Sequence, residues 1–224
     1  MKTKDKIILT SLDLFNERGE RNVSTNHIAS HLNISPGNLY YHFRNKSDII
    51  YEIFKNYKLM VDTYLNVPHD RAVHINDLIA YLDAVFNGLW AYRFLHRDLE
   101  HLLDNDERLR KDYRQFTLDC LASVKGIIVE MERSEIYRPM TEAQRNSKAL
   151  NTWLIVTNWM TYLKTVHDEE SDDHSAFSRQ TIKHGVYQVL DYVMPYFCEN
   201  KRSQAAELQA AYRFEGIVPK ATIE

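Results

Sequence analysis

Two helix-start signals that follow each other closely, at Ser24 and at Ser35, constrain the fold of this chain more than any other feature. Serine commonly caps helix N-termini, and the apolar residues after Ser24 fall on one helical face. These residues are Ile28, Ala29 and Leu32. Ser35 is followed by Pro36, whose missing N–H costs nothing at the first position of a helix. The pattern therefore predicts two short helices in immediate succession.

The turn between these two helices is predicted at Asn33, because asparagine tolerates positive φ better than most other residues. In the second helix, Leu39 and Phe43 are four residues apart and are expected to face inward. Tyr40 then lies at the border, and the outward-facing residues are Gly37, Asn38, Tyr41 and His42. A short helix with small and polar residues at its start and aromatic hydrogen-bonding residues further along is suited to the major groove of DNA.

This stretch resembles the N-terminal signature of the tetracycline-repressor (TetR) family of transcriptional regulators. The matching residues are Thr25, Ile28, Ala29, Ser35, Gly37, Leu39, Tyr40, Tyr41, His42, Phe43 and Lys46. Asn33 departs from the family pattern, which usually has glycine there. The resemblance extends over about residues 4–60. It implies a helix-turn-helix DNA-binding head, followed by a helical domain that binds a small effector and forms a homodimer.

Within the head, we expect Gly37 and Asn38, with Thr25 across the turn, to read bases. Longer side chains are better suited to phosphates, which position a protein without specifying a sequence. They are Tyr40, Tyr41, His42 and Lys46. The complete predicted DNA-binding set is Thr25, Asn26, Ser35, Pro36, Gly37, Asn38, Tyr40, Tyr41, His42 and Lys46. His27 and His31 have a spacing that metal sites use, but with no third ligand nearby a solvated or phosphate-contacting pair is favoured.

Composition predicts an all-α fold. Only 6 Gly and 5 Pro among 224 residues leave few helix breakers, and no convincing period-two alternation occurs. The charged N-terminus contains no signal peptide, and no segment is apolar enough to cross a membrane. The two cysteines, Cys120 and Cys198, are too few for a disulfide framework. A cytoplasmic protein that does not associate with membranes is therefore expected.

The charges are distributed unevenly between the predicted domains. Residues 1–60 hold nine Lys/Arg and six Asp/Glu, a net charge of +3. The remainder holds 28 − 9 = 19 basic and 31 − 6 = 25 acidic residues, a net charge of −6. This difference favours contact with phosphate at one end of the molecule, although taken alone it is weak support.

Helical periodicity continues to the end of the chain. Helices are predicted at 4–18, 45–68, 74–96, 99–113, 113–134, 141–167 and 175–198, with a weaker pattern at 203–213. We expect a DNA-binding domain at residues 1–50 and an effector-binding and dimerisation domain at 51–224. The patterns at 141–167 and 175–198 are apolar on more than one face, which indicates either a helix bundle shared by two subunits or the centre of one large core. The family resemblance favours the homodimer.

Aromatic residues of the second domain are candidates for an effector pocket, although such residues are usually plain core. The predicted lining is Phe86, Trp90, Phe94, Phe116, Trp153 and Thr157. The head is also similar to those of regulators of polyhydroxyalkanoate and fatty-acid metabolism, which suggests a fatty acyl effector. No catalytic constellation occurs, so an enzyme is not expected, nor is a cofactor or metal. The predicted function is a repressor that binds a palindromic double-stranded DNA operator and is released by a small apolar effector. The alternative is a DNA-binding protein without a ligand, with an architectural or constitutive role.

Overall fold

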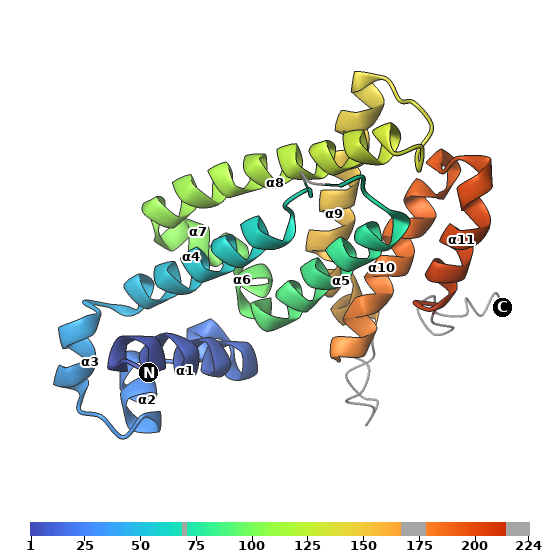
Figure 1. Cartoon of the computed structure of the whole chain (residues 1–224). Helices are drawn as coiled ribbons and strands as arrows, with labels where there is room; N and C mark the ends of the chain where they lie inside the picture. The colour runs from blue at the N-terminus through green and yellow to red at the C-terminus, as the bar shows by residue number, and fades with distance from the viewer. Residues whose placement is uncertain (69–70, 167–177, 214–224) are drawn as a thin grey trace. The chain divides into compact units, whose positions relative to one another are not determined.

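The computed structural model describes residues 1–68, 71–166 and 178–213, and this part of the chain is helical (Figure 1). Among these residues the only strand-like pairing is a single antiparallel bridge between Tyr137 and Phe197. The predicted all-α fold is therefore confirmed.

The N-terminal helices occur in the predicted order. They are α1 (Thr3–Arg18), the 3-10 turn η1 (Glu20–Asn22), α2 (Thr25–His31), α3 (Pro36–His42) and α4 (Lys46–Tyr64). Gly19 ends α1, with a φ of 86° that glycine adopts readily. Asn45 precedes α4 and accepts a hydrogen bond of 2.9 Å from the Asp48 N–H, as expected of a helix cap.

The rest of the described chain forms seven α-helices and one 3-10 turn. They are α5 (Ile75–Ala91), α6 (Arg93–Arg97), α7 (Leu99–Asn105), α8 (Glu107–Arg133), α9 (Glu142–Val166), α10 (Arg179–Val193), η2 (Met194–Tyr196) and α11 (Glu199–Ala210).

The predicted division into helices at 99–113 and 113–134 is wrong. The break falls at Asp106, which is extended, and its carboxylate accepts a hydrogen bond of 3.0 Å from the Leu109 N–H at the start of α8. Tyr113, by contrast, is buried inside α8. An aspartate that satisfies a free N–H of the next helix competes with continuation of the previous one, so it sets the boundary.

Three other predicted helices are shorter than expected. The helix predicted at 45–68 ends at Tyr64. The pattern at 74–96 is interrupted at Tyr92, whose backbone is not helical, and this residue separates α5 from α6. The pattern at 175–198 ends at Val193, because Pro195 has no N–H with which to continue the α-helix and lies in η2 instead. Residues 175–177 at its start lie outside the described ranges.

The chain divides into two compact units. Unit 1 comprises Met1–Thr63 and Ala91–Thr117, and unit 2 comprises Tyr64–Trp90 and the described residues from Leu118 onward. Helix α8 contributes residues to both units, since the division falls between Thr117 and Leu118.

In unit 1, the end of α1 is fixed to α6. The buried Asn16 side chain donates to the Ala91 carbonyl at 2.7 Å and accepts from the Phe94 N–H at 3.1 Å. Arg97 donates to the Phe15 carbonyl at 2.7 Å and to the Asn16 carbonyl at 3.4 Å, and the Asn16 carbonyl is one of those that a helix C-terminus leaves free. The rings of Phe15 and Phe94 pack against each other with centroids 5.1 Å apart.

A second aromatic cluster in unit 1 joins α4 to α8. The Phe54 ring lies 5.7 Å from that of Tyr113 and 5.8 Å from that of Phe116, measured between centroids. The Tyr57 hydroxyl and the His96 Nε2 are 3.0 Å apart. Burial lowers the pKa of His96 to about 4, so its imidazole is neutral at physiological pH.

Helix α10 packs closely against α5 and α9 in the core of unit 2. Phe86 on α5 is fully buried, and Gly185 on α10 lies directly against it. A Cβ atom at position 185 would come within 2.9 Å of Trp159 Cδ1 and closer still to the Phe86 ring. Glycine is therefore required here by packing between helices.

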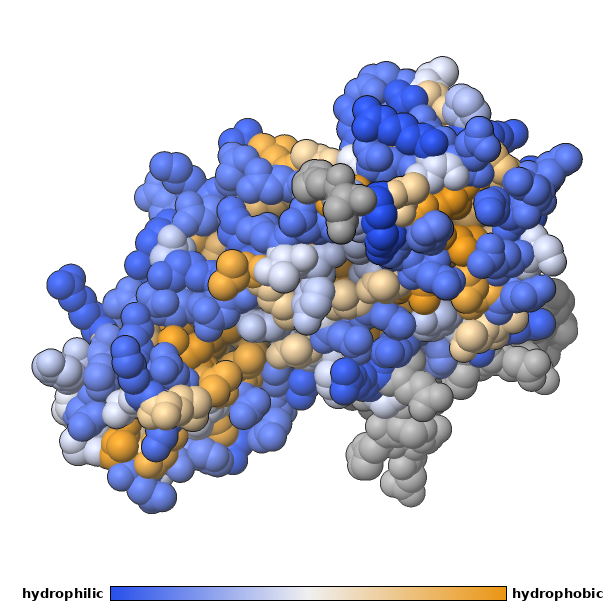
Figure 2. All heavy atoms as spheres, viewed as in Figure 1, coloured by the Kyte–Doolittle hydropathy of each residue, from blue (hydrophilic) through white to orange (hydrophobic). Residues whose placement is uncertain are grey.

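The face seen in Figure 2 is mainly hydrophilic, with hydrophobic residues in patches between the polar ones. None of the described helices combines the length and the hydrophobicity that crossing a bilayer would require.

We predict opposite effects for two glycine-to-alanine substitutions inside helices. Gly185→Ala should lower the free energy of unfolding by about 1–3 kcal/mol, because the added methyl overpacks the core against Phe86. Gly126→Ala on α8 should raise the free energy of unfolding by about 0.5–1 kcal/mol, because a Cβ added there would have nothing within 4 Å and alanine favours the helix. Urea denaturation followed by circular dichroism measures both values. A Gly185→Ala protein as stable as the Gly126→Ala protein would contradict this account.

Candidate nucleic-acid interface

The turn between α2 and α3 has the conformation that the sequence predicts. Asn33 has a φ of 53°, in the left-handed region. The Asn33 N–H donates to the Ser30 carbonyl at 3.1 Å, and the Ile34 N–H donates to the Ala29 carbonyl at 3.0 Å. These bonds satisfy carbonyls at the end of α2 and fix the angle at which the chain enters α3.

Helix α2 begins with a reciprocal cap. The Ser24 side chain accepts a hydrogen bond from the His27 N–H at 3.2 Å, and the Ser24 N–H donates to His27 Nδ1 at 3.3 Å. His27 therefore has the role that glutamate or glutamine usually has in a capping box. The spacing of His27 from His31 gave no indication of this role. Among the described residues, no group of three His, Cys, Asp or Glu side chains is arranged to hold a metal ion.

Helix α3 has one buried face and one exposed face, as expected. Leu39 is completely buried, and Phe43 at its C-cap is nearly so. Ser35 caps the helix by accepting from the Asn38 N–H at 3.2 Å, with Pro36 at the first helical position. The predicted DNA-binding residues of the opposite face are exposed or half-buried: Ser35, Pro36, Gly37, Asn38, Tyr40, Tyr41 and His42. Tyr41 is the most exposed large hydrophobic side chain among the described residues, at 85%.

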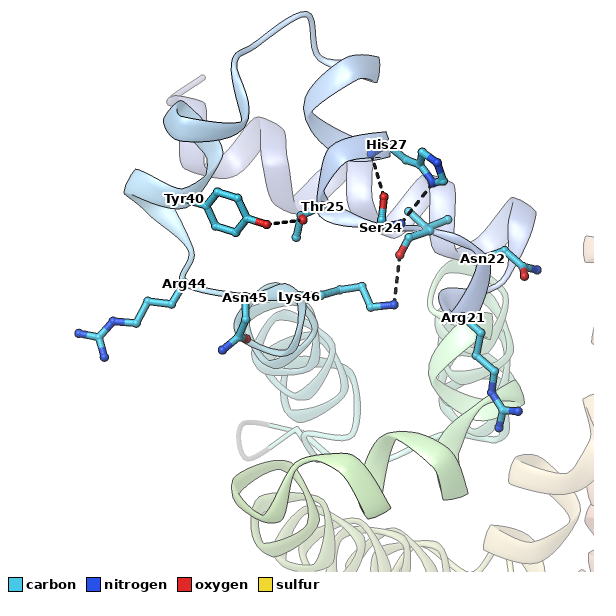
Figure 3. Close-up of a pocket in the computed structure, with 10 residues that line it drawn as sticks. Arg21, Asn22, Ser24, Thr25, His27, Tyr40, Arg44, Asn45 and Lys46 are labelled. Carbon is cyan, nitrogen blue, oxygen red and sulfur yellow. Dashed lines mark hydrogen bonds between the residues drawn. The ribbon is translucent and has the colours of Figure 1, made fainter.

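A hollow lies between the start of α2, the second half of α3 and the start of α4 (Figure 3). It is lined by Arg21, Asn22, Val23, Ser24, Thr25, His27, Tyr40, Arg44, Asn45 and Lys46. The Thr25 and Tyr40 hydroxyls are 2.9 Å apart and hydrogen-bonded, so the two helices present them as a pair. Predicted residue Asn26 is exposed next to Thr25 but does not line this hollow.

Lys46 is half-buried and its ammonium is bonded to protein oxygens, whereas the sequence pattern predicted a phosphate contact for it. Its ammonium lies 2.6 Å from Glu20 Oε1 and donates to the carbonyls of Glu20 and Val23 at 3.0 and 3.1 Å. An ammonium has three hydrogens, and here three oxygens accept them. The Glu20 side chain is only 5% exposed, and burying a carboxylate without a partner is costly, so this contact stabilises it.

The residues predicted to line an effector pocket are divided between the two units. Phe94 and Phe116 belong to unit 1, and Phe86, Trp90, Trp153 and Thr157 belong to unit 2. In unit 1, Phe94 packs on Phe15, and Phe116 packs on Phe54 and Tyr57.

In unit 2, Phe86 is fully buried beside Gly185, whereas Trp90 is half-buried against the same hydrophobic core. Trp153 and Thr157 are neighbours on α9, since the Thr157 hydroxyl donates to the Trp153 carbonyl at 2.8 Å. Their side chains are also half-buried.

Removing the Lys46 side chain should destabilise the chain. We expect Lys46→Ala to lower the free energy of unfolding by about 2–3 kcal/mol, because it leaves the buried Glu20 carboxylate without its cation. Lys6→Ala, an exposed lysine on α1, is the control and should stay within about 0.5 kcal/mol of the parent. Equal stabilities of the two variants in urea titrations would show that the ion pair contributes nothing.

Comparison with known proteins gives two family matches. Residues 56–205 match the family described as TetR, bacterial transcriptional repressor, and residues 7–53 match the bacterial regulatory proteins of the tetR family. A TetR-family transcriptional regulator from Marinobacter aquaeolei VT8 has a similar crystal structure, with 52% sequence identity and a TM-score of 0.89. That similarity covers 96% of this chain and 100% of the other.

Two more distant relatives match either part of the sequence or the fold. IcaR of Staphylococcus epidermidis, a negative transcriptional regulator of the biofilm operon icaADBC, is 31% identical over 114 residues. The matched region is 51% of this chain and 53%, about half, of IcaR. SmeT, the repressor of the Stenotrophomonas maltophilia multidrug efflux pump SmeDEF, shares the fold with 16% identity and a TM-score of 0.61, over 100% of this chain and 96% of SmeT.

The helix-turn-helix geometry of α2 and α3 agrees with both family matches, which together extend over most of the described chain. The chain belongs to the TetR family of transcriptional regulators, whose members bind DNA.

Proposed function

We propose that this regulator is a repressor that binds a palindromic operator as a homodimer and is released by a small effector. The observation that carries the DNA-binding part is the exposed face of α3, where Gly37, Asn38 and Tyr41 are free of packing contacts with the core. Operator DNA lies in the cytoplasm, and we place the protein there.

The proposed base contacts come from the first turn of α3. Gly37 has no side chain to hold the backbone away from the groove, and Asn38 can donate to and accept from adenine. Only the backbone N–H of Asn38 is used by the cap, so its side-chain amide remains available. Thr25 and Tyr40, which bond each other, lie beside this turn and suit the groove wall.

The homodimer is supported by the exposed face of α9 and α10 in unit 2. Leu150 and Leu154 are one turn apart on α9, and each is 47% exposed. A surface hollow adjoins them, lined by Leu154, Ile155, Asn158, Trp159, Tyr162, Gln188, Asp191 and Tyr192. Apolar and aromatic side chains of this kind are enriched at subunit interfaces, and two such helices from each subunit would form a four-helix contact.

A dimer of this kind should protect a symmetric DNA site. The two recognition helices must enter major grooves on one face of the duplex, about 34–36 Å or a multiple of that spacing apart. DNase footprinting on a site selected from random-sequence DNA should show two equivalent half-sites. Asn38→Ala should weaken binding by about 1–3 kcal/mol and relax the preference at one base pair of each half-site.

Asn56→Ala is the matched control for this experiment. Asn56 is an exposed asparagine on α4, outside the proposed interface, and its removal should leave both the affinity and the base preference unchanged. Binding by a monomer to an asymmetric site, or the same loss in both variants, would argue against the proposed interface.

We propose a largely apolar effector, with a fatty acyl chain or its coenzyme A thioester as the first compounds to test. The proposal is supported by the aromatic residues of the second domain and by the likeness of the head to regulators of fatty-acid and polyhydroxyalkanoate metabolism. We place the domain boundary near residue 50 and the effector contacts within unit 2, at Phe86, Trp90, Trp153 and Thr157. Those residues that are half-buried, Trp90, Trp153 and Thr157, are the most accessible of this set.

An effector releases DNA only if it binds the operator-incompatible arrangement more tightly. We therefore expect a saturating effector to weaken operator binding about 5–150-fold, equivalent to about 1–3 kcal/mol of coupling. Fluorescence anisotropy of labelled operator, titrated with fatty acids and acyl thioesters of increasing length, measures this loss. Compounds that bind the protein while operator affinity stays constant would favour the alternative function, a regulator without a ligand.

A further inference from the structure

We infer that Arg44, and not Lys46, is the cation of this segment that contacts the DNA backbone, and that Lys46 is a positioning residue. This inference rests on the proposed operator binding. It assigns a phosphate contact to a residue that the sequence pattern did not select.

The first step is that Lys46 has no hydrogen left for a phosphate. Its three acceptors are all protein oxygens, one from the Glu20 carboxylate and two from backbone carbonyls. To reach DNA, the ammonium would have to leave a carboxylate that is 5% exposed, whose next partner among the described residues is His101, at 3.7 Å. Stripping a buried carboxylate of its cation costs more free energy than one phosphate contact returns.

The second step is that Arg44 lies in the right place and has no competing partner. It follows directly after Phe43, the C-cap of recognition helix α3, and it lines the hollow together with Tyr40 and Asn45. Its side chain is exposed and makes no hydrogen bond or ion pair with any residue that the structure describes. In Figure 3 its guanidinium extends away from the ribbon, on the side of the hollow that carries Tyr40.

The third step concerns the charge of the hollow. Its lining holds three cations, Arg21, Arg44 and Lys46, and no carboxylate. Glu20 neutralises Lys46 from outside this lining, so the two guanidiniums carry the uncompensated charge. An arginine presents several donors in one plane and binds phosphate oxygens in pairs, which suits a backbone contact beside the Thr25 and Tyr40 hydroxyls.

Arg21 provides an internal comparison. It is also exposed and also lines the hollow, but it belongs to η1 and in Figure 3 it extends from the opposite end, away from Tyr40. If the hollow acted only through its general positive field, loss of either arginine would have the same effect. A direct contact at Arg44 predicts that they differ.

The salt dependence of binding tests this assignment. Binding of a fixed-length random-sequence duplex and of a selected operator is measured at several salt concentrations for the wild type, Arg44→Ala, Arg21→Ala and Lys46→Ala. The slope of the logarithm of the association constant against the logarithm of the salt concentration is negative. Its magnitude decreases by about 0.9 for each duplex phosphate that a variant no longer neutralises. We expect this decrease in Arg44→Ala only, on both duplexes, and we expect Arg44→Lys to restore the wild-type slope.

The remaining outcomes are equally definite. Lys46→Ala should unfold at lower urea concentration but, wherever circular dichroism shows it folded, should keep the wild-type slope. A wild-type slope in Arg44→Ala, or equal decreases in Arg44→Ala and Arg21→Ala, would overturn the assignment. A wild-type protein that binds neither duplex would instead contradict the proposed function, so the two failures are distinguishable.

Discussion

The helix-turn-helix depends on one buried charge pair, the Lys46 ammonium and the Glu20 carboxylate at 2.6 Å. Glu20 lies just before α2 and Lys46 just after α3, so the pair closes the segment that contains both helices. The two carbonyl contacts of Lys46, to Glu20 and Val23, bring the start of α4 against the approach to α2. A buried carboxylate needs a partner, because leaving it unpaired is costly. The arrangement in which Lys46 meets Glu20 is therefore strongly favoured.

Within the segment between Glu20 and Lys46, short-range interactions determine where α2 and α3 begin and how the chain turns between them. Ser24 and Ser35 each accept a hydrogen bond from the N–H three residues later, and Asn33 supplies the left-handed turn between them. These interactions leave the Asn38 side chain on α3 without a hydrogen-bond partner among the described residues, which is the condition for using it on another molecule. Lys46 thus positions the two helices, whereas exposed residues of α3 and Arg44 are the ones proposed to contact DNA.

The two units use different means to hold their helices together. Unit 1 combines aromatic packing with polar bridges such as the one from Asn16 to Ala91 and Phe94, which fix the end of α1. Unit 2 relies on close helix contact, shown by Gly185 against Phe86, and on ion pairs such as Arg145 with Glu132 at 2.7 Å. Helix α8 carries residues of both units on one continuous helix.

The sequence by itself determined the features that depend on a few neighbouring residues. It predicted the all-α class, the cap residues Ser24 and Ser35, the turn at Asn33 and the inward residues Leu39 and Phe43, and each of these is observed. Caps and turns are predictable because the interacting groups lie within about four residues of each other.

Only the tertiary structure decided which polar side chains are used internally. Lys46 and Glu20 are far apart in sequence, and nothing local distinguishes Lys46 from the neighbouring cation Arg44. Yet Lys46 is half-buried and paired with Glu20, whereas Arg44 is exposed. The helix break at Asp106 depends on a local cap, the bond from the Leu109 N–H, but periodicity alone did not show that this cap outweighs continuation of the helix. Periodicity reports which face of a helix is apolar, but it does not report which partner a charged group meets, because that depends on contacts distant along the chain.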